Sequence, residues 1–166
     1  MSKLSHCYFA SDLHLGHEYM AKIRGFENHS HFFEVLKQNW NEAIPHEHIP
    51  VYILGDVVMR KEAFPLLNEL NGAKRFVLGN HDLWPNTPRE YGKTYPMVVS
   101  PGEELVLTHF PVHEMYFMFG QADWCNLHGH LHGWTIDNPR YLNLCLEHTN
   151  YRPIDYNEVQ RRLKRD

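Results

Sequence analysis

Five times along this 166-residue chain, a short apolar run ends directly in side chains that can bind a metal ion. Apolar runs of this length are typical of buried strands. In α/β proteins the carboxyl ends of parallel strands meet at one edge of the sheet, where ligands bind. We therefore expect the following side chains to converge: Asp12 and His14, Asp56, Asn80, His109, and His130 with His132.

Strands and helices alternate through the first half of the chain, which favours an α/β layered architecture. The pattern predicts strands at 4–10, 51–54 and 75–78 and helices at 30–44 and 62–70. The second half is more meander-like. It predicts a hairpin from 97–99 and 105–108, strands at 124–127 and 141–146, and a last helix capped by Asp155 that extends to about residue 165. No linker interrupts the pattern, so we expect a single domain over residues 1–166 without a separate cap domain.

The expected ligands are carboxylates, an amide and imidazoles, without a thiolate. This set suits Mn²⁺, Fe, Zn²⁺ or Mg²⁺ and disfavours a structural cysteine-type zinc site. Because one ion cannot use all of these donors, we expect two ions about 3.5–4 Å apart, bridged by a carboxylate and a hydroxide. Asp56 stands alone after its strand and is the expected bridge. Coordination lowers the pKa of water from 15.7 to about 7, which makes the bridging hydroxide the expected nucleophile.

The stretch Gly79-Asn80-His81-Asp82 places a titratable ring beside an expected ligand. A leaving alkoxide needs a proton, and His81 is the expected general acid. Nearby dications would favour the neutral form of His81, and the negative charge of Asp82 is expected to oppose that effect.

Taken in order, the motifs Asp-x-His, Gly-Asn-His-Asp and Gly-His-x-His resemble those of the calcineurin-like metallophosphoesterase superfamily. The chain is most similar to small bacterial and phage members that begin Ser-Asp-Leu-His-x-Gly-His-Glu, which here is residues 11–18. The resemblance implies a four-layer α-β-β-α sandwich of two mixed β-sheets flanked by helices. It assigns His81 as general acid and implies two divalent ions, with Mn²⁺ preferred over Fe, Zn²⁺, Ni²⁺ or Mg²⁺. The implied ligands are Asp12, His14, Asp56 and His132 for the first ion, and Asp56, Asn80, His109 and His130 for the second.

The function expected from these features is hydrolysis of a small-molecule phosphoester. Phosphodiesters are favoured over monoesters, because an alkoxide leaving group benefits from a dedicated acid. His17 and Arg60 are the expected substrate-binding residues, and His113 and His128 are weaker candidates for lining the site.

Two alternatives remain. One is a non-catalytic interaction module that uses aromatic residues around Tyr116, Phe117 and Phe119. The other is a metal-dependent nuclease, against which the net charge of -4 counts because it provides no basic field for nucleic acid.

Cysteine usage indicates the compartment. Cys7, Cys125 and Cys145 each lie in an apolar run and form no C-x-x-C pair, so we expect buried free thiols. The odd number of cysteines and the absence of a leader pattern or an apolar run of about 18 residues predict a cytoplasmic protein with no membrane partner.

Overall fold

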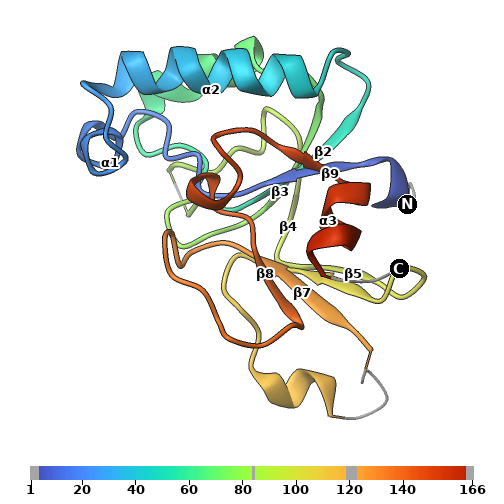
Figure 1. Ribbon diagram of the computed structural model, residues 1–166. Coiled ribbons are helices and arrows are strands. Elements are labelled where there is room, and N and C mark those ends of the chain that lie inside the picture. Colours follow the sequence, from blue (N-terminus) through green and yellow to red (C-terminus); the bar gives the residue numbers. More distant parts are fainter. Residues whose placement is uncertain (1–3, 84, 119–122, 164–166) are drawn as a thin grey trace.

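The chain folds into two β-sheets that pack face to face, with helices around them (Figure 1). The computed structural model describes residues 4–83, 85–118 and 123–163. The first sheet has the order β4-β3-β2-β1-β9, made of β1 (Tyr8–Ala10), β2 (Pro50–Leu54), β3 (Ala73–Val77), β4 (Lys93–Tyr95) and β9 (Ile154–Asp155). The second has the order β5-β6-β7-β8, made of β5 (Val98–Ser100), β6 (Leu105–Leu107), β7 (Cys125–His128) and β8 (Tyr141–Asn143).

Both sheets are mixed. In the first sheet β1 to β4 are parallel and β9 runs antiparallel to β1. In the second sheet β5 and β6 form the predicted antiparallel hairpin, but β6, β7 and β8 are parallel, so the expected meander is wrong. After β6 and again after β7 the chain crosses back before it enters the next strand, and such a connection makes neighbouring strands parallel.

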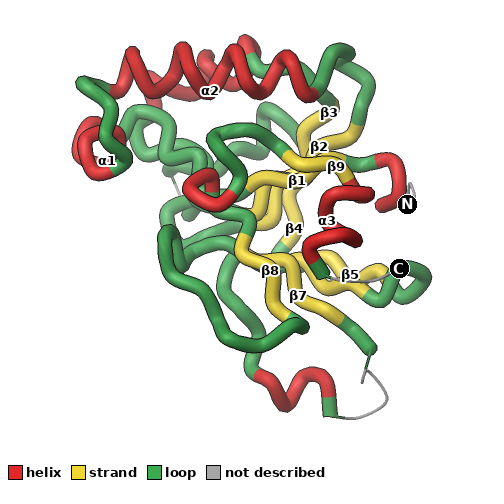
Figure 2. The backbone as a smooth tube through the Cα atoms, in the orientation of Figure 1, coloured by secondary structure: helices red, strands yellow, loops and turns green. Residues whose placement is uncertain are grey.

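Helices and 3₁₀ turns surround the sheets, as the tube in Figure 2 shows. The helices are α1 (Glu18–Ile23), α2 (His29–Ala43) and α3 (Tyr156–Arg162). The 3₁₀ turns are η1 (Leu4–His6), η2 (Lys61–Glu69), η3 (Glu114–Phe117) and η4 (Leu146–His148). The predicted long helix is α2: Asn28 accepts a hydrogen bond from the backbone N–H of His31 at its start, and Leu36 and Trp40 are buried on its inner face.

Two apolar clusters separate the layers. One lies between the first sheet and α2 with η2, and it includes Trp40 and Ile53. The other lies between the two sheets and includes Leu54 from β2, Leu127 from β7 and Val159 from α3. Successive residues of β2 therefore belong to the two clusters in alternation, because successive side chains of a strand point to opposite faces of the sheet.

The outer face of the second sheet is covered by η3. There the Phe117 ring packs edge-on against the Tyr141 ring, with 5.7 Å between the ring centroids. Two mixed sheets with helical elements on their outer faces confirm the predicted α-β-β-α sandwich. Phe117 is only 2% exposed, so this part of the aromatic run belongs to the core, whereas Phe119 lies outside the described residues.

Three predicted elements differ in detail. The strand expected at 4–10 occupies only Tyr8–Ala10, because the chain before it forms η1 and buries Leu4 between the sheets. The helix expected at 62–70 is the 3₁₀ turn η2, which contains Pro65; proline has no N–H to donate to a helical hydrogen bond. The strand expected at 141–146 ends at Asn143, where its side chain accepts a hydrogen bond from the Cys145 N–H.

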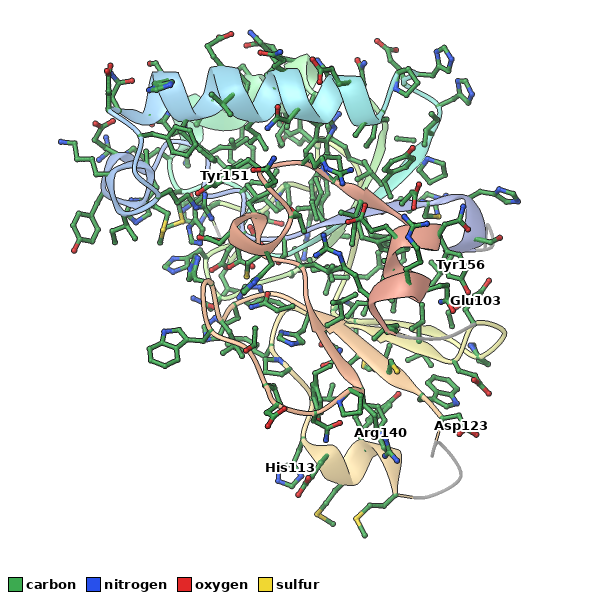
Figure 3. The ribbon with its side chains drawn as sticks, viewed as in Figure 1. Glu103, His113, Asp123, Arg140, Tyr151 and Tyr156 are labelled. Atoms are coloured by element: carbon green, nitrogen blue, oxygen red, sulfur yellow. The ribbon has the colours of Figure 1, made fainter. Side chains whose placement is uncertain are left out.

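The segment after β8 returns to the first sheet and closes the fold. Figure 3 shows Tyr151 below α2, and its ring meets the Phe26 ring edge-on at 5.0 Å. The Asp155 side chain then accepts the Glu158 N–H at 2.7 Å and caps α3, as predicted. Among the described residues, no helix is both long enough and apolar enough to cross a membrane.

Candidate metal centre

The candidate ligands lie in the loops that leave the carboxyl ends of five strands. Asp12, Asp56 and Asn80 follow β1, β2 and β3 of the first sheet, and His109 and His130 follow β6 and β7 of the second. Because these strands are parallel within each sheet, their ends lie along common edges. The two edges are joined by a hydrogen bond between His109 Nδ1 and the Leu54 carbonyl (2.9 Å), and by another from the His130 N–H to Asp12 (2.9 Å).

Backbone strain is concentrated in these loops. The candidate ligands with φ between 47° and 69° are Asp12, His14, Asp56, His130 and His132. Non-glycine residues rarely adopt this left-handed conformation, and each costs free energy that the surrounding structure must offset. Strain shared by this many candidate ligands indicates that their side chains are held in place for a function.

The first cluster consists of Asp12, His14 and Asp56, all of them buried. His14 Nε2 lies 3.6 Å from Asp12 Oδ1 and 3.8 Å from Asp56 Oδ2, which is too long for hydrogen bonds. Asp12 Oδ1 and both ring nitrogens of His14 are buried without a hydrogen-bond partner among the described residues. Two donors on one ion, each about 2.0–2.2 Å from it, would be about 3–3.6 Å apart. A cation between them would satisfy Asp12 Oδ1 and the Nε2 of His14.

Burial alone would raise the pKa of Asp12, but the His14 ring beside it and the charge of His109 outweigh burial and hold that pKa well below its usual range. Asp12 is therefore an anion in this site. An anionic carboxylate that is completely buried requires a positive partner.

The second cluster consists of Asp56, His109 and His130. His109 Nε2 lies 3.5 Å from Asp56 Oδ1 and 3.0 Å from Asn80 Oδ1. When Nδ1–H of His109 donates to the Leu54 carbonyl, Nε2 and Asn80 Oδ1 face each other with lone pairs. A cation would also resolve this juxtaposition, so the donor set fits a metal ion.

Asp56 belongs to both clusters and presents a different oxygen to each. Oδ2 faces His14 and Oδ1 faces His109. Gly79 permits this arrangement, because a Cβ at position 79 would lie 2.3 Å from Asp56 Oδ1. A carboxylate shared in this way can bridge two ions.

A third cluster joins Asp12, His132 and Cys145. His132 Nε2 lies 3.9 Å from Asp12 Oδ1, and the Cys145 thiol lies 3.2 Å from Asp12 Oδ2, to which it donates. Burial, followed by the charge of Asp12, raises the pKa of Cys145, so the residue is a thiol. Cys7, Cys125 and Cys145 are all buried, as predicted, and none of the three forms a disulfide bond within the described part of the chain.

His81 lies at the open side of the site. Its Nε2 is 3.9 Å from Asp56 Oδ2, its side chain is 45% exposed, and its ring centroid is 5.9 Å from that of His14. It is thus within reach of the clusters while it faces solvent, which is the arrangement that a proton donor to a bound substrate requires.

Asp82 is completely buried, and its carboxylate accepts backbone N–H groups from Asp56 (2.8 Å), Val57 (2.9 Å) and Gly79 (2.8 Å). These bonds tie the loop after β2 to the loop after β3. The hydrogen bonds therefore assign Asp82 a positioning role toward Asp56, which differs from the direct effect on His81 that the sequence suggested.

The expected substrate-binding residues lie on the α1 and η2 side. His17 caps α1 by accepting the Met20 N–H, and its ring centroid is 5.8 Å from that of His14. Burial, and after it repulsion from the His14 ring, lowers the pKa of His17. Arg60 is exposed at the start of η2 and lies close enough for its charge to contribute to the same lowering.

The two weaker candidates do not join this group. His113 caps η3 by accepting the Met115 N–H, and Figure 3 shows it beside η3. His128 is completely buried in β7 next to Tyr141, and its Nδ1 is hydrogen-bonded to the Gly129 carbonyl oxygen at 2.9 Å.

Sequence reasoning missed two charged residues behind His132. Glu147 Oε1 lies 3.0 Å from His132 Nδ1 and 2.9 Å from Arg24 Nε. The hydrogen bond to Glu147 raises the pKa of His132. Burial alone would raise the pKa of Glu147, but His132 and Arg24 outweigh it and lower that pKa to about 2. No local spacing marks either residue, because they meet only through the fold.

Substitution of Gly129 by alanine tests how closely the loop after β7 approaches the loop after β1. A Cβ at position 129 would lie 1.9 Å from Ser11 Oγ and 2.2 Å from Asp12 Oδ2, so Asp12 must move. We expect Gly129→Ala to lower the free energy of unfolding by about 1–3 kcal/mol and to weaken metal binding. Gly133→Ala, in the same motif, meets no atom within 4 Å and is the matched control. Equal urea midpoints for the two variants would contradict the close approach.

Comparisons with known proteins agree with this architecture. The profile described as "Calcineurin-like phosphoesterase" matches residues 6–162. An uncharacterised protein of Methanocaldococcus jannaschii is 29% identical over 95% of this chain and 91% of its own length. Among solved structures, a protein of unknown function from Aquifex aeolicus has a TM-score of 0.71 at 23% identity and covers 93% of this chain and 97% of its own. Pseudomonas putida nuclease MPE has a TM-score of 0.50 at 18% identity and covers 77% of this chain and 62% of its own. With a family profile that extends over most of its length, the chain belongs to the calcineurin-like phosphoesterase family.

Proposed function

We propose that this protein is a metal-dependent hydrolase that uses a dinuclear centre to cleave phosphoesters, with phosphodiesters favoured over monoesters. The observation that carries the proposal is the position of Asp56, whose two oxygens face two different ligand clusters. The proposed ligands are Asp12, His14, Asp56 and His132 for one ion, and Asp56, Asn80, His109 and His130 for the other. Mn²⁺ is the proposed metal, since oxygen and imidazole donors suit it.

Ions bound at these positions would supply Lewis acidity toward the phosphate and a water that is acidic enough to attack at neutral pH. The remaining chemistry belongs to the protein. His81 donates a proton to the leaving oxygen from its half-exposed position, while Asp82 holds the loops that carry Asp56 and Gly79. His17 and Arg60 bind the phosphate on the α1 and η2 side.

The ligand loops leave strands of the two packed sheets, which supports a site that is formed within a single domain. Three buried cysteines without a disulfide bond among the described residues support a reducing cytoplasmic compartment. The half-exposed His81 and the exposed Arg60 support small or protruding phosphoesters as substrates.

A substrate panel tests the proposal. Chelator-treated protein reloaded with Mn²⁺ is expected to hydrolyse bis(p-nitrophenyl) phosphate faster than p-nitrophenyl phosphate, in line with the proposed preference for phosphodiesters; because both substrates release p-nitrophenolate, the comparison tests the class of ester and not the leaving group. Chelator-treated protein without added metal should hydrolyse neither. Absence of turnover with Mn²⁺, Fe²⁺, Zn²⁺, Ni²⁺ and Mg²⁺ alike would overturn the assignment as an enzyme and would favour the interaction module.

A nuclease is the second candidate, and the fold that the chain shares with the Pseudomonas putida nuclease is what favours it. The net charge of -4 counts against long nucleic acid, although two bound dications would offset it locally. The same panel should therefore include single-stranded DNA and RNA. Faster cleavage of these strands than of the aryl diester would make the nuclease the better description.

A further inference from the structure

A charged pair lies directly behind the candidate ligand His132. Arg24 comes from the end of α1 and Glu147 from η4, 123 residues apart in the sequence. Their side chains are 1% and 19% exposed, and Arg24 Nε donates to Glu147 Oε1 at 2.9 Å. A largely buried ion pair contributes little to stability on average, so stability alone does not account for this pair.

The pair holds two different parts of the metal centre. Glu147 Oε1 lies 3.0 Å from His132 Nδ1. On the other side, Arg24 Nη2 donates to the Asp12 carbonyl at 2.7 Å, and Nη1 donates to the Leu13 carbonyl at 3.3 Å. One guanidinium and one carboxylate thus connect the ring of His132 to the backbone of the Asp12 loop. Both loops contain the strained residues, Asp12 at φ 57° and His132 at φ 47°.

The orientation of His132 follows from this connection. An Nδ1–H that donates to Glu147 leaves the lone pair on Nε2, which faces Asp12 Oδ1 at 3.9 Å. The His132 carbonyl is also held, because the Asn143 side chain donates to it at 2.9 Å. Glu147 therefore selects both the tautomer and the direction of the ring. Arg24 compensates the carboxylate charge, so Glu147 orients the ring without adding a net negative charge behind it.

We propose that Glu147, held by Arg24, is a positioning residue that sets the affinity of the ion site formed by Asp12 and His132, and leaves the site formed by His109 and His130 largely unaffected. This inference rests on the proposed dinuclear centre. Outer carboxylates that orient histidine ligands are commonly worth about 10- to 100-fold in metal affinity. We expect a loss of that size, confined to one of the two ions.

Calorimetric titration of the metal-free protein with Mn²⁺ tests this, together with electron paramagnetic resonance of the loaded protein. The unmodified protein should bind two ions and show the spectrum of a coupled Mn²⁺ pair. Glu147→Ala should retain one strong site, lose about 10- to 100-fold in affinity at the other, and show an isolated Mn²⁺ signal at one equivalent. Glu147→Gln keeps an oxygen acceptor and the side-chain size, so its affinity at the weakened site should lie between that of the unmodified protein and that of Glu147→Ala. Glu69→Ala removes a surface glutamate paired with Lys37 and is the control.

A double-mutant cycle separates positioning from general destabilisation. If Glu147 acts through His132, Glu147→Ala should add nothing to the loss that His132→Ala causes at the same ion. The inference would be overturned by additive losses of affinity in the double variant. It would also be overturned if Glu147→Ala weakened the binding of both ions equally or left the affinity for both ions unchanged. The proposed function fails separately, when the unmodified protein itself does not bind two ions or does not hydrolyse phosphoesters.

Discussion

Replacement of Asp56 by asparagine is expected to reduce bound metal from two ions per chain to one or none. Asparagine has nearly the same size, but it has no charge and only one side-chain oxygen. It therefore cannot bind both the ion beside His14 and the ion beside His109. Two dications about 3.5–4 Å apart repel each other strongly unless an anion lies between them. Since even outer carboxylates change metal affinity by about 10- to 100-fold, loss of the bridge should exceed that range, and hydrolysis should be lost with the metal.

The fold should survive this substitution, because the Asp56 N–H still donates to Asp82 and an amide oxygen can still accept the His81 N–H. Metal analysis after dialysis measures the effect, and circular dichroism checks the fold. Asp137→Asn, at an exposed aspartate, is the matched control. Retention of two ions by Asp56→Asn would show that Asp56 is not the bridge.

Replacement of His81 by alanine is expected to have the opposite profile, with both ions retained and turnover lost. The His81 side chain lies 3.9 Å from Asp56 at the open side of the site, where it can reach a leaving group without being needed as a ligand. Loss of a general acid typically costs about 10²–10⁴-fold. The loss should be large for alkyl leaving groups and small for p-nitrophenolate, which needs no proton.

A series of phosphodiesters with leaving groups of increasing pKa measures this difference as a steeper dependence of log(kcat/KM) on leaving-group pKa in the variant. His46→Ala removes an exposed histidine that precedes β2, at the opposite end of that strand from Asp56, and serves as the control. If His81→Ala and the unmodified protein gave the same slope, His81 would have no part in proton transfer.

The candidate ligands could be located from the sequence because each follows a strand, and the strand-end rule relates a local pattern to a common position in space. This rule alone was enough to locate Asp12, Asp56 and His109. The buried face of α2 was also predictable, since the spacing of Leu36 and Trp40 is a local signal.

Contacts between distant segments could not be predicted. Glu147 and Arg24 meet only after α1 and η4 have packed against the ligand loops, and no spacing of residues encodes that contact. The parallel pairing of β7 and β8 depends on where the connecting segment crosses, which strand patterns do not specify. For Asp82, the sequence showed a charge beside His81, but only the fold shows that three backbone N–H groups occupy its carboxylate.

The most direct test of the dinuclear phosphoesterase is a titration of the metal-free protein with Mn²⁺ in which bound metal and hydrolysis of bis(p-nitrophenyl) phosphate are followed in the same samples. The shared position of Asp56 between two clusters predicts little turnover at one equivalent and a rise that saturates at two bound ions per chain. Full turnover with a single bound ion, or none with two, would contradict the account.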